Sequence, residues 1–483
     1  MRSPFNPQPE LGSLPIEKIL IPTNSRDELP PVLAGLQWIW THPCLRAQIL
    51  ELLSQKIMAG KKSTGRTGMD LWHILVLGVV RLALDADWDR MGYLANYDSL
   101  LRQMLGLNTS SSSELNKAFH RRTLRDNVSL LDAELLQKIN ALVAASGREV
   151  FNPHTPMAVR VDSFVLESDV HFPTDFNLLW DAGRKCLDGI DKFLQRRFEL
   201  PGWRKAQDWH RRLKGAERAS SRASSGGGKN KDQRVLSLSQ DYLKIALELA
   251  GKLDESRPRI LKQLTSAQDL ALSVQLDYFR KMLGKHIDLL DRRVLQAQTI
   301  PASEKLYSLF EPHTEWINKG KLNPSVELGH RVLITTEQNQ LIVDYKARTG
   351  VDVKESIGVV DRLLGQFGNK AIGSVSFDKG FTSAEAKELI GLYIPIVVMP
   401  KRGKKTPAQK VEEKERKFVS LRRAHSAVES AINALEHHGL NRCLDLGEEG
   451  FDRYVGYGVL AYNLHLIGRK ILSTRENSEQ EAA

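Results

Sequence analysis

One acidic residue inside an apolar run restricts the fold of this chain more than any other feature. Residues 157–165 read Met-Ala-Val-Arg-Val-Asp-Ser-Phe-Val, and their β-branched and apolar residues predict a buried strand. An unpaired charge in such a strand would be costly, so Asp162 needs a partner. A second short apolar run, residues 371–381, ends at Asp378 and turns at Gly380. The sequence therefore predicts two strands that each present one acid.

A third acid, Glu429, lies in residues 421–436, which contain no Gly or Pro and show a helical pattern. Two acids on strands and one on a later helix can meet only through folding, and such a set of carboxylates is what a two-metal site needs. A pair of Mg²⁺ ions about 3.5–4 Å apart holds both the attacking and the leaving oxygen of a phosphodiester. The three acids thus favour phosphoryl transfer on nucleic acid. Glu436, further along the same predicted helix face, is the alternative to Glu429.

The residues around these acids carry a resemblance to a known family. The matching stretches are residues 161–175, 377–381 and 423–429, with a further match within 319–329. Through most of residues 20–470 the chain resembles bacterial insertion-sequence transposases of the Asp-Asp-Glu (DDE) class, in particular the ISNCY group.

The resemblance implies a ribonuclease H-like catalytic core in which Asp162, Asp378 and Glu429 bind Mg²⁺ or Mn²⁺, two ions in all. It also implies the reaction: water cleaves the DNA at the end of the element, and the freed 3′-hydroxyl then attacks target DNA. Because two ends must be brought together, we expect a homodimer or larger assembly on double-stranded DNA.

Strand and helix patterns predict a mixed α/β fold with several parts. Strands alternate with helices after residue 331, which predicts a mixed sheet. The N-terminal helices either recognise DNA ends and assist assembly, as in the resembled transposases, or simply support the core. The predicted parts are an extended arm (1–30), an N-terminal all-helical domain (31–150), the catalytic core (151–180 and 301–470), a large basic helical insertion (181–300) and a flexible tail (471–483).

The positive charge of the chain points to a polyanionic partner. The formal net charge is +11, and between residues 196 and 234 twelve basic residues stand against four acidic ones. Such clusters neutralise phosphates with little sequence preference, so they favour DNA contact over a merely solvated face. Trp203 and Trp209 lie among them and either stack on bases or anchor helices to a core. The candidate DNA-binding residues are Arg196, Arg197, Arg204, Lys205, Arg211, Arg212, Lys214, Lys319, Lys321, Lys379, Lys401, Arg402, Arg422 and His425.

Some of these candidates adjoin the predicted catalytic acids. Lys379 directly follows Asp378, and its positive charge is suited to stabilise the negative charge that develops on the phosphate. Lys401 and Arg402 begin a basic connection that either grips the DNA backbone or serves as a solvated linker. His425 assists proton transfer, contacts a phosphate, or lies next to the metal ligands and supports them.

Other classes of function are disfavoured. No run of about 18 uncharged apolar residues suggests a membrane span, and the three isolated cysteines show no zinc-site spacing. We expect a cytoplasmic, nucleoid-associated protein with no membrane partner. Two other functions remain open, namely a metal-dependent DNA nuclease without strand transfer and a catalytically inactive DNA-binding derivative.

Overall fold

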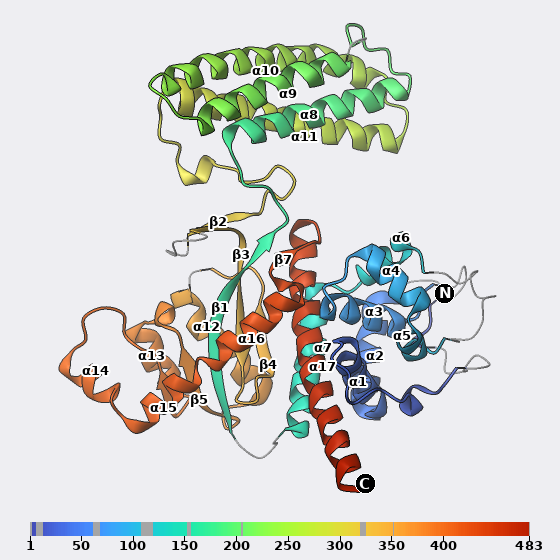
Figure 1. Ribbon diagram of the computed structural model, residues 1–483, viewed down its shortest axis with the longest axis vertical. Helices are drawn as coiled ribbons and strands as arrows, with labels where there is room; N and C mark the ends of the chain where they lie inside the picture. Colours follow the sequence, from blue (N-terminus) through green and yellow to red (C-terminus); the bar gives the residue numbers. More distant parts are fainter. Residues whose placement is uncertain are drawn as a thin grey trace. The chain divides into compact units, whose positions relative to one another are not determined.

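The chain folds into two compact units. The computed structural model describes residues 2–5, 13–60, 68–107, 119–151, 156–203, 206–318, 325–350 and 352–482, with side chains except those of 352 and 479–482 (Figure 1). One unit, the helical unit, comprises residues 170–316, and the other, the sheet unit, comprises residues 1–169 and 317–483. The helical unit contains the whole of the predicted insertion 181–300.

The sheet unit is built on a mixed sheet, as the strand and helix patterns predict. In the order β2-β3-β1-β5-β6, β1 pairs antiparallel with β3 and parallel with β5, and β5 pairs parallel with β6. In addition, β4 pairs antiparallel with β3, and β7 pairs parallel with the end of β1. The strands are β1 (Met157–Ser168), β2 (Glu315–Asn318), β3 (Val326–Thr336), β4 (Ile342–Lys346), β5 (Ile372–Phe377), β6 (Ile396–Val398) and β7 (Arg442–Cys443).

Helices of the sheet unit come from both ends of the chain and from the connections between strands (Figure 1). The N-terminal set is η1 (Ile16–Lys18), α1 (Leu29–Thr41), α2 (Pro43–Ile57), α3 (Leu71–Ala83), α4 (Trp88–Tyr97), α5 (Ser99–Met104), α6 (Arg121–Val128), α7 (Ala133–Gly147) and η3 (Arg148–Val150). The later set is α12 (Asp352–Phe367), η6 (Lys379–Phe381), α13 (Ala384–Gly391), α14 (Pro407–Glu412), α15 (Arg416–Ala424), α16 (Ala427–Leu435), η7 (Glu436–Leu440) and α17 (Gly447–Ala482).

Each face of the sheet has its own core. On one face, Phe164 and Leu166 of β1 pack with apolar residues of α16, α17 and the N-terminal helices. On the other, Val159 and Val161 pack with α12 and α13. The N-terminal helices, predicted as a separate domain, therefore share one continuous core with the sheet. Residues 471–482, predicted as a flexible tail, continue α17.

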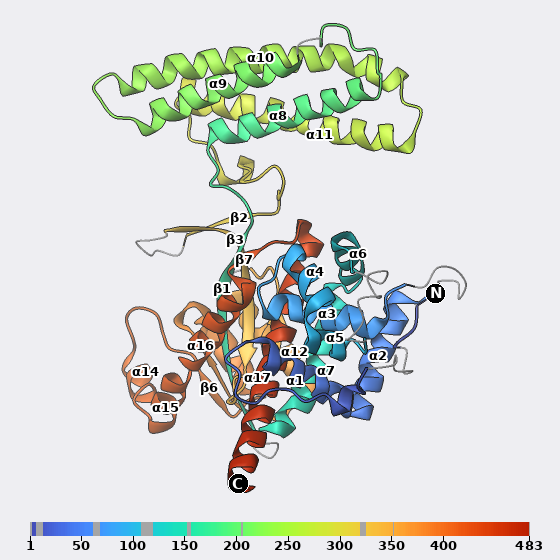
Figure 2. The same cartoon turned by 45° about the vertical axis from the view of Figure 1, so that its right-hand side comes forward.

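The helical unit consists of long helices that run side by side (Figures 1 and 2). Helix α8 packs against α9 and α11, and α10 packs against the same two helices. Thr174 and Asp175 are both placed by the sequence to cap α8, and Thr174 does so through a capping box. The elements are α8 (Asp175–Gln195), α9 (Ala206–Ser225), α10 (Lys231–Lys262), α11 (Ala267–Leu290), η4 (Asp291–Leu295) and η5 (Ala302–Glu304).

Three local predictions differ from the structure. The apolar pattern of residues 170–172 favours a further stretch of strand, but β1 ends at Ser168. The Gly- and Ser-rich composition of residues 219–231 predicts a loop over the whole stretch, but α9 extends to Ser225. The helix predicted over residues 421–436 is divided into α15 and α16 by a break at His425 and Ser426.

Candidate active site

The pairing of β1 with β5 brings two of the predicted acids to neighbouring positions. The strands run parallel, and their register ends with Val161 beside Phe377. The residues that follow are Asp162 and Asp378, which therefore stand at one level on strands about 4.8 Å apart. Asp162 is half-buried, whereas Asp378 is exposed at the point where β5 gives way to η6.

Both acids belong to the face of the sheet that α16 covers. Side chains alternate between the faces of a strand, so Asp162 shares its face with Phe164. Phe164 packs in the same core as Val428 of α16. On β5, Asp378 shares its face with Ser376, whose hydroxyl lies 3.0 Å from the imidazole of His425, just before α16. The acids and the start of α16 thus lie on the same side of the sheet.

His425 ties the beginning of α16 to the sheet. Its Nδ1 lies 3.0 Å from Oγ of Ser376, and its buried Nε2 has no hydrogen-bond partner in the described part of the chain. Burial lowers the pKa of His425, while the carboxylate of Asp378 opposes this shift and the guanidinium of Arg160 adds to it. The imidazole is therefore neutral at pH 7, and it contributes hydrogen bonding but no charge to the site.

The helix α16 packs on β1 and carries Glu429 in its first turn. Just before α16, His425 contacts Ser376, whose partner in the β1–β5 register is Arg160. At the other end of β1, the carbonyl of Asn441 accepts a hydrogen bond from Glu167 N. Glu429 is exposed.

The carboxylate oxygens of the three acids are too widely spaced in this structure to bind a single ion together. Within the described residues, one group of three ligating side chains has all its donor atoms within 4.8 Å of one another, and it is Glu28, His438 and His465. Asp162, Asp378 and Glu429 are more widely spaced than that. Wider spacing is compatible with two ions about 3.5–4 Å apart, which share some ligands and not others.

Glu436, the alternative to Glu429, occupies a different place. It is the first residue of η7, directly after α16. It lines a cavity of about 500 Å³ together with Glu167, Glu327 and Arg442. Glu429 is not among the described residues that line this cavity.

Most candidate DNA-binding residues of the helical unit are paired with acids. These ion pairs hold the cations close to the protein surface and offset their charge. They join Arg196 to Asp269 (2.6 Å), Arg211 to Asp208 (4.0 Å), Arg212 to Glu248 (2.9 Å) and Lys214 to Glu217 (2.7 Å). Arg197 is exposed and forms no ion pair with the described residues. Trp203 is fully buried and donates to Ser256 Oγ (2.8 Å), so it serves the core.

The charges of a second group of cations in the same unit are not offset by acidic side chains in the described part of the chain. Its members surround the turn from α9 to α10, are exposed, and form no ion pair with acids among the residues that the structure describes. They belong to the basic cluster seen in the sequence, where a Gly- and Ser-rich run without acids marks this turn. They are Arg218, Arg222, Lys229 and Arg234.

The remaining candidates lie around the predicted catalytic acids or outside the described residues. Lys379 and Arg402 are exposed, Lys401 is half-buried, and Arg422 lies 3.6 Å from Glu413. The residues outside the description are Arg204, Lys205, Lys319 and Lys321.

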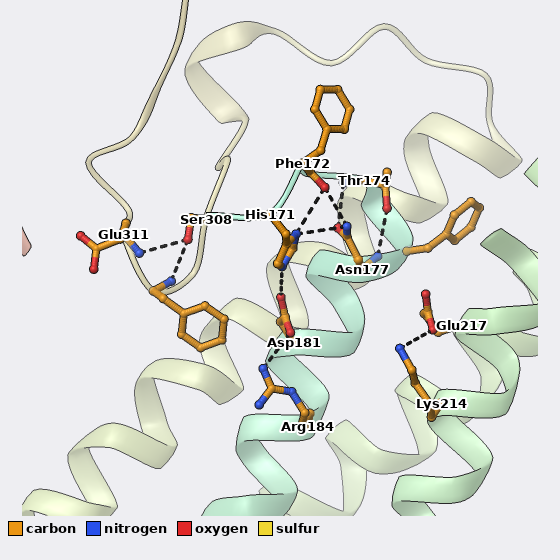
Figure 3. Close-up of polar contacts among 12 residues, drawn as sticks. His171, Phe172, Thr174, Asn177, Asp181, Arg184, Lys214, Glu217, Ser308 and Glu311 are labelled. Carbon is orange, nitrogen blue, oxygen red and sulfur yellow. Dashed lines mark hydrogen bonds and ion pairs between the residues drawn. The ribbon is translucent and has the colours of Figure 1, made fainter. Parts of the chain in front are cut away.

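A polar cluster surrounds the start of α8 in the helical unit (Figure 3). His171 Nε2 lies 2.6 Å from Asp181 Oδ2, and Arg184 donates to the other oxygen of Asp181 (2.9 Å). Asn177 donates to the carbonyl of Phe172 (2.8 Å). The hydrogen bonds of His171 therefore have a structural role at the start of α8.

No protein-family model, curated protein or solved structure matches the chain. Within its described residues, the protein has no helix that is both long and apolar enough to cross a bilayer.

Proposed function

We propose that this chain is a DDE-class DNA transposase that cleaves the ends of an insertion sequence and joins the 3′-hydroxyl to target DNA. The observation that carries the proposal is the β1–β5 register, which sets Asp162 beside Asp378 on the sheet face that α16 covers. Glu429 lies in α16, the helix that packs on this face. Carboxylates from two strands and one helix are the donors that hard divalent cations take.

A ribonuclease H-like core is part of this proposal. In its support, β1 has an antiparallel neighbour on one side and a parallel neighbour on the other, and the parallel neighbour ends directly before Asp378. Ligand sites of α/β sheets form outside the carboxyl ends of parallel strands. Asp378, directly after the carboxyl end of β5, therefore stands where this architecture places chemistry, and Asp162 is its neighbour from the middle of β1.

Asp162, Asp378 and Glu429 would hold two Mg²⁺ or Mn²⁺ ions. Their donor set fits, because all three offer hard oxygen ligands and two of the three are exposed to incoming DNA. The bound ions would activate the attacking oxygen and neutralise the leaving one. His425 acts as a positioning residue, since its bond to Ser376 fixes the start of the Glu429 helix. The exposed ammonium of Lys379 would meet charge on the phosphate.

Double-stranded DNA is the partner that the proposal requires, with a dimer or larger assembly holding two ends. The unpaired cations between α9 and α10 support DNA contact, because exposed cations without acidic partners are free to neutralise phosphates. Such a protein would act at the nucleoid.

The proposal is tested by cleavage and strand-transfer assays on the DNA that flanks the gene, with Mg²⁺ or Mn²⁺. We expect Asp162→Asn, Asp378→Asn and Glu429→Gln each to reduce both reactions by at least about 100-fold, since each removes a metal ligand. Glu436→Gln is the matched control, because it makes the same change seven residues further along the chain, at a residue that lines a separate cavity, and it should retain activity. Full activity of Asp378→Asn would refute the assignment.

The same assay separates the alternatives. A metal-dependent nuclease would give cleaved ends without joined products, and these would depend on the same three acids. A catalytically inactive DNA-binding derivative would give neither product, although it would still bind the flanking DNA.

A further inference from the structure

Three side chains far apart in the sequence form a cluster with the composition of a transition-metal site. Glu28 directly precedes α1, His438 lies in η7, and His465 lies in α17. Their donor atoms all lie within 4.8 Å of one another. We propose that Glu28, His438 and His465 bind one divalent transition-metal ion, with Zn²⁺ as the preferred ion.

The distances suit such an ion. His465 Nε2 lies 2.6 Å from Glu28 Oε2, and the rings of His438 and His465 have centroids 5.3 Å apart. Tetrahedral Zn²⁺ with bonds of about 2.0–2.1 Å sets its ligand atoms roughly 3.4 Å apart. That separation lies between the 2.6 Å contact of His465 with Glu28 and the 4.8 Å within which all the donor atoms lie. Small movements of the side chains are therefore enough to admit the ion, which takes the place of the proton between His465 and Glu28.

His438 is oriented as metal-binding histidines are. Its Nδ1 lies 2.8 Å from the carbonyl oxygen of Ala83, and because a carbonyl only accepts, Nδ1 must carry the hydrogen. The lone pair then resides on Nε2. A ligating imidazole that donates its other N–H to a backbone carbonyl is the usual supporting contact of metal sites. Gly439, with φ of +90°, turns the chain directly after His438 and fixes its position.

The surroundings of His465 and Glu28 also favour binding. His465 offers Nε2 to the ion from α17, and Glu28 offers a carboxylate oxygen from the residue before α1. The side chain of Glu28 is half exposed, so water has access to a fourth position. Two imidazoles and one carboxylate select Zn²⁺ and its neighbours Co²⁺ and Ni²⁺ over Mg²⁺, which prefers oxygen ligands.

The bound ion would connect three segments that are far apart in the sequence. It would link the start of α1 and the long helix α17 to the turn that follows α16. The inference does not depend on the proposed enzymatic activity. Its consequence is a metal-dependent gain in the stability of the sheet unit.

The test uses full-length protein without a histidine tag, stripped of metal, in an Asp162→Asn, Asp378→Asn background that removes two acids of the candidate catalytic site. We expect one Zn²⁺ per chain and a rise in Tm of at least about 3 °C when free Zn²⁺ is ~100 times Kd. Co²⁺ should give the visible absorption of a tetrahedral site with nitrogen ligands. Mg²⁺ should give neither signal.

Variants decide whether these three residues are the ligands. His438→Ala should weaken Zn²⁺ binding by more than about 100-fold, because loss of a ligand costs more than loss of its supporting contact. Glu28→Gln, at the surface, gives the same test if His438→Ala folds poorly. His437→Ala, which removes the exposed neighbouring histidine, is the control and should bind as the parent does. Equal loss in His437→Ala, or no Zn²⁺-dependent rise in the parent, would overturn the proposal.

Discussion

At the scale of single residues, His286 is buried without a hydrogen bond to one of its ring nitrogens. The side chain lies in α11, is 2% exposed and lines a cavity of about 730 Å³ within the helical unit. Its Nε2 has no partner within the described residues. Burial lowers the pKa of His286 to about 4, the charge of Lys285 adds to the shift, and Asp181 opposes it.

This histidine makes the stability of the helical unit depend on pH. In the unfolded chain its pKa is about 6.5, so between pH 6.5 and about 4 the unfolded chain binds a proton that the folded chain does not. The contribution of His286 is therefore complete above pH 6.5 and declines as the pH falls. We expect it to account for about 2 kcal/mol of lost stability between pH 7.5 and pH 5.

Hydrogen exchange of α11 peptides, corrected for the intrinsic effect of pH, measures this loss. His286→Leu should remove most of this pH-dependent loss of stability. The substitution should not reduce stability at pH 7.5, because it also removes the ring nitrogen that has no hydrogen-bond partner. His171→Gln should instead increase the loss of stability at low pH. The hydrogen bond to Asp181 raises the pKa of His171, so that residue stabilises the fold below pH 6.5. An unchanged pH dependence in His286→Leu would contradict the prediction.

At the scale of secondary-structure elements, α1 and α17 touch through their backbones. A Cβ atom on Gly468 would lie 1.8 Å from the carbonyl oxygen of Pro31, and one on Gly35 would lie 2.2 Å from that of Leu464. No side chain fits between the helices at these points. Glycine is therefore required here by the close approach of two helix backbones.

Substitution of Gly468 by alanine should force these helices apart. We expect Gly468→Ala to lower the free energy of unfolding of the sheet unit by about 3 kcal/mol or more, as overpacking of a core does. Gly365→Ala is the matched control: Gly365 is an exposed residue within α12, nothing lies within 4 Å of the added Cβ, and a gain of about 0.5–1 kcal/mol is expected. Chemical denaturation compares the two, and equal effects would contradict the argument.

The sequence predicted some elements well and others poorly, for physical reasons. The hairpin of β3 and β4 and the strand with Asp162 were predicted because their apolar patterns are local. The break before α16 was not, because residues 421–436 contain no Gly or Pro and the hydrogen bond from His425 to Ser376 joins residues 49 positions apart. The cluster of Glu28, His438 and His465 was missed for the same reason, since no local motif connects its members.

At the scale of the whole molecule, the net charge of +11 is distributed unevenly between paired and unpaired cations. Several of the predicted DNA-binding residues have acidic partners, as Arg196 and Arg212 do. A cation that is already paired gains less from a phosphate, because its acid must be displaced first. The sequence shows how many cations a region has, but it does not show which of them folding leaves unpaired.

This difference gives a prediction for DNA binding by the full chain. The affinity for nonspecific duplex should fall with salt, with a slope that reflects the number of phosphates neutralised. Replacing the unpaired set, Arg218, Arg222, Lys229 and Arg234, by glutamine should weaken binding and reduce that slope by up to about 0.9 for each lost phosphate contact. Replacing Arg196, Arg211, Arg212 and Lys214, which removes the same charge, should change the slope less. Titrations by fluorescence anisotropy from about 50 to 200 mM salt measure both sets. Equal slopes for the two variants would show that DNA does not distinguish paired from unpaired cations here.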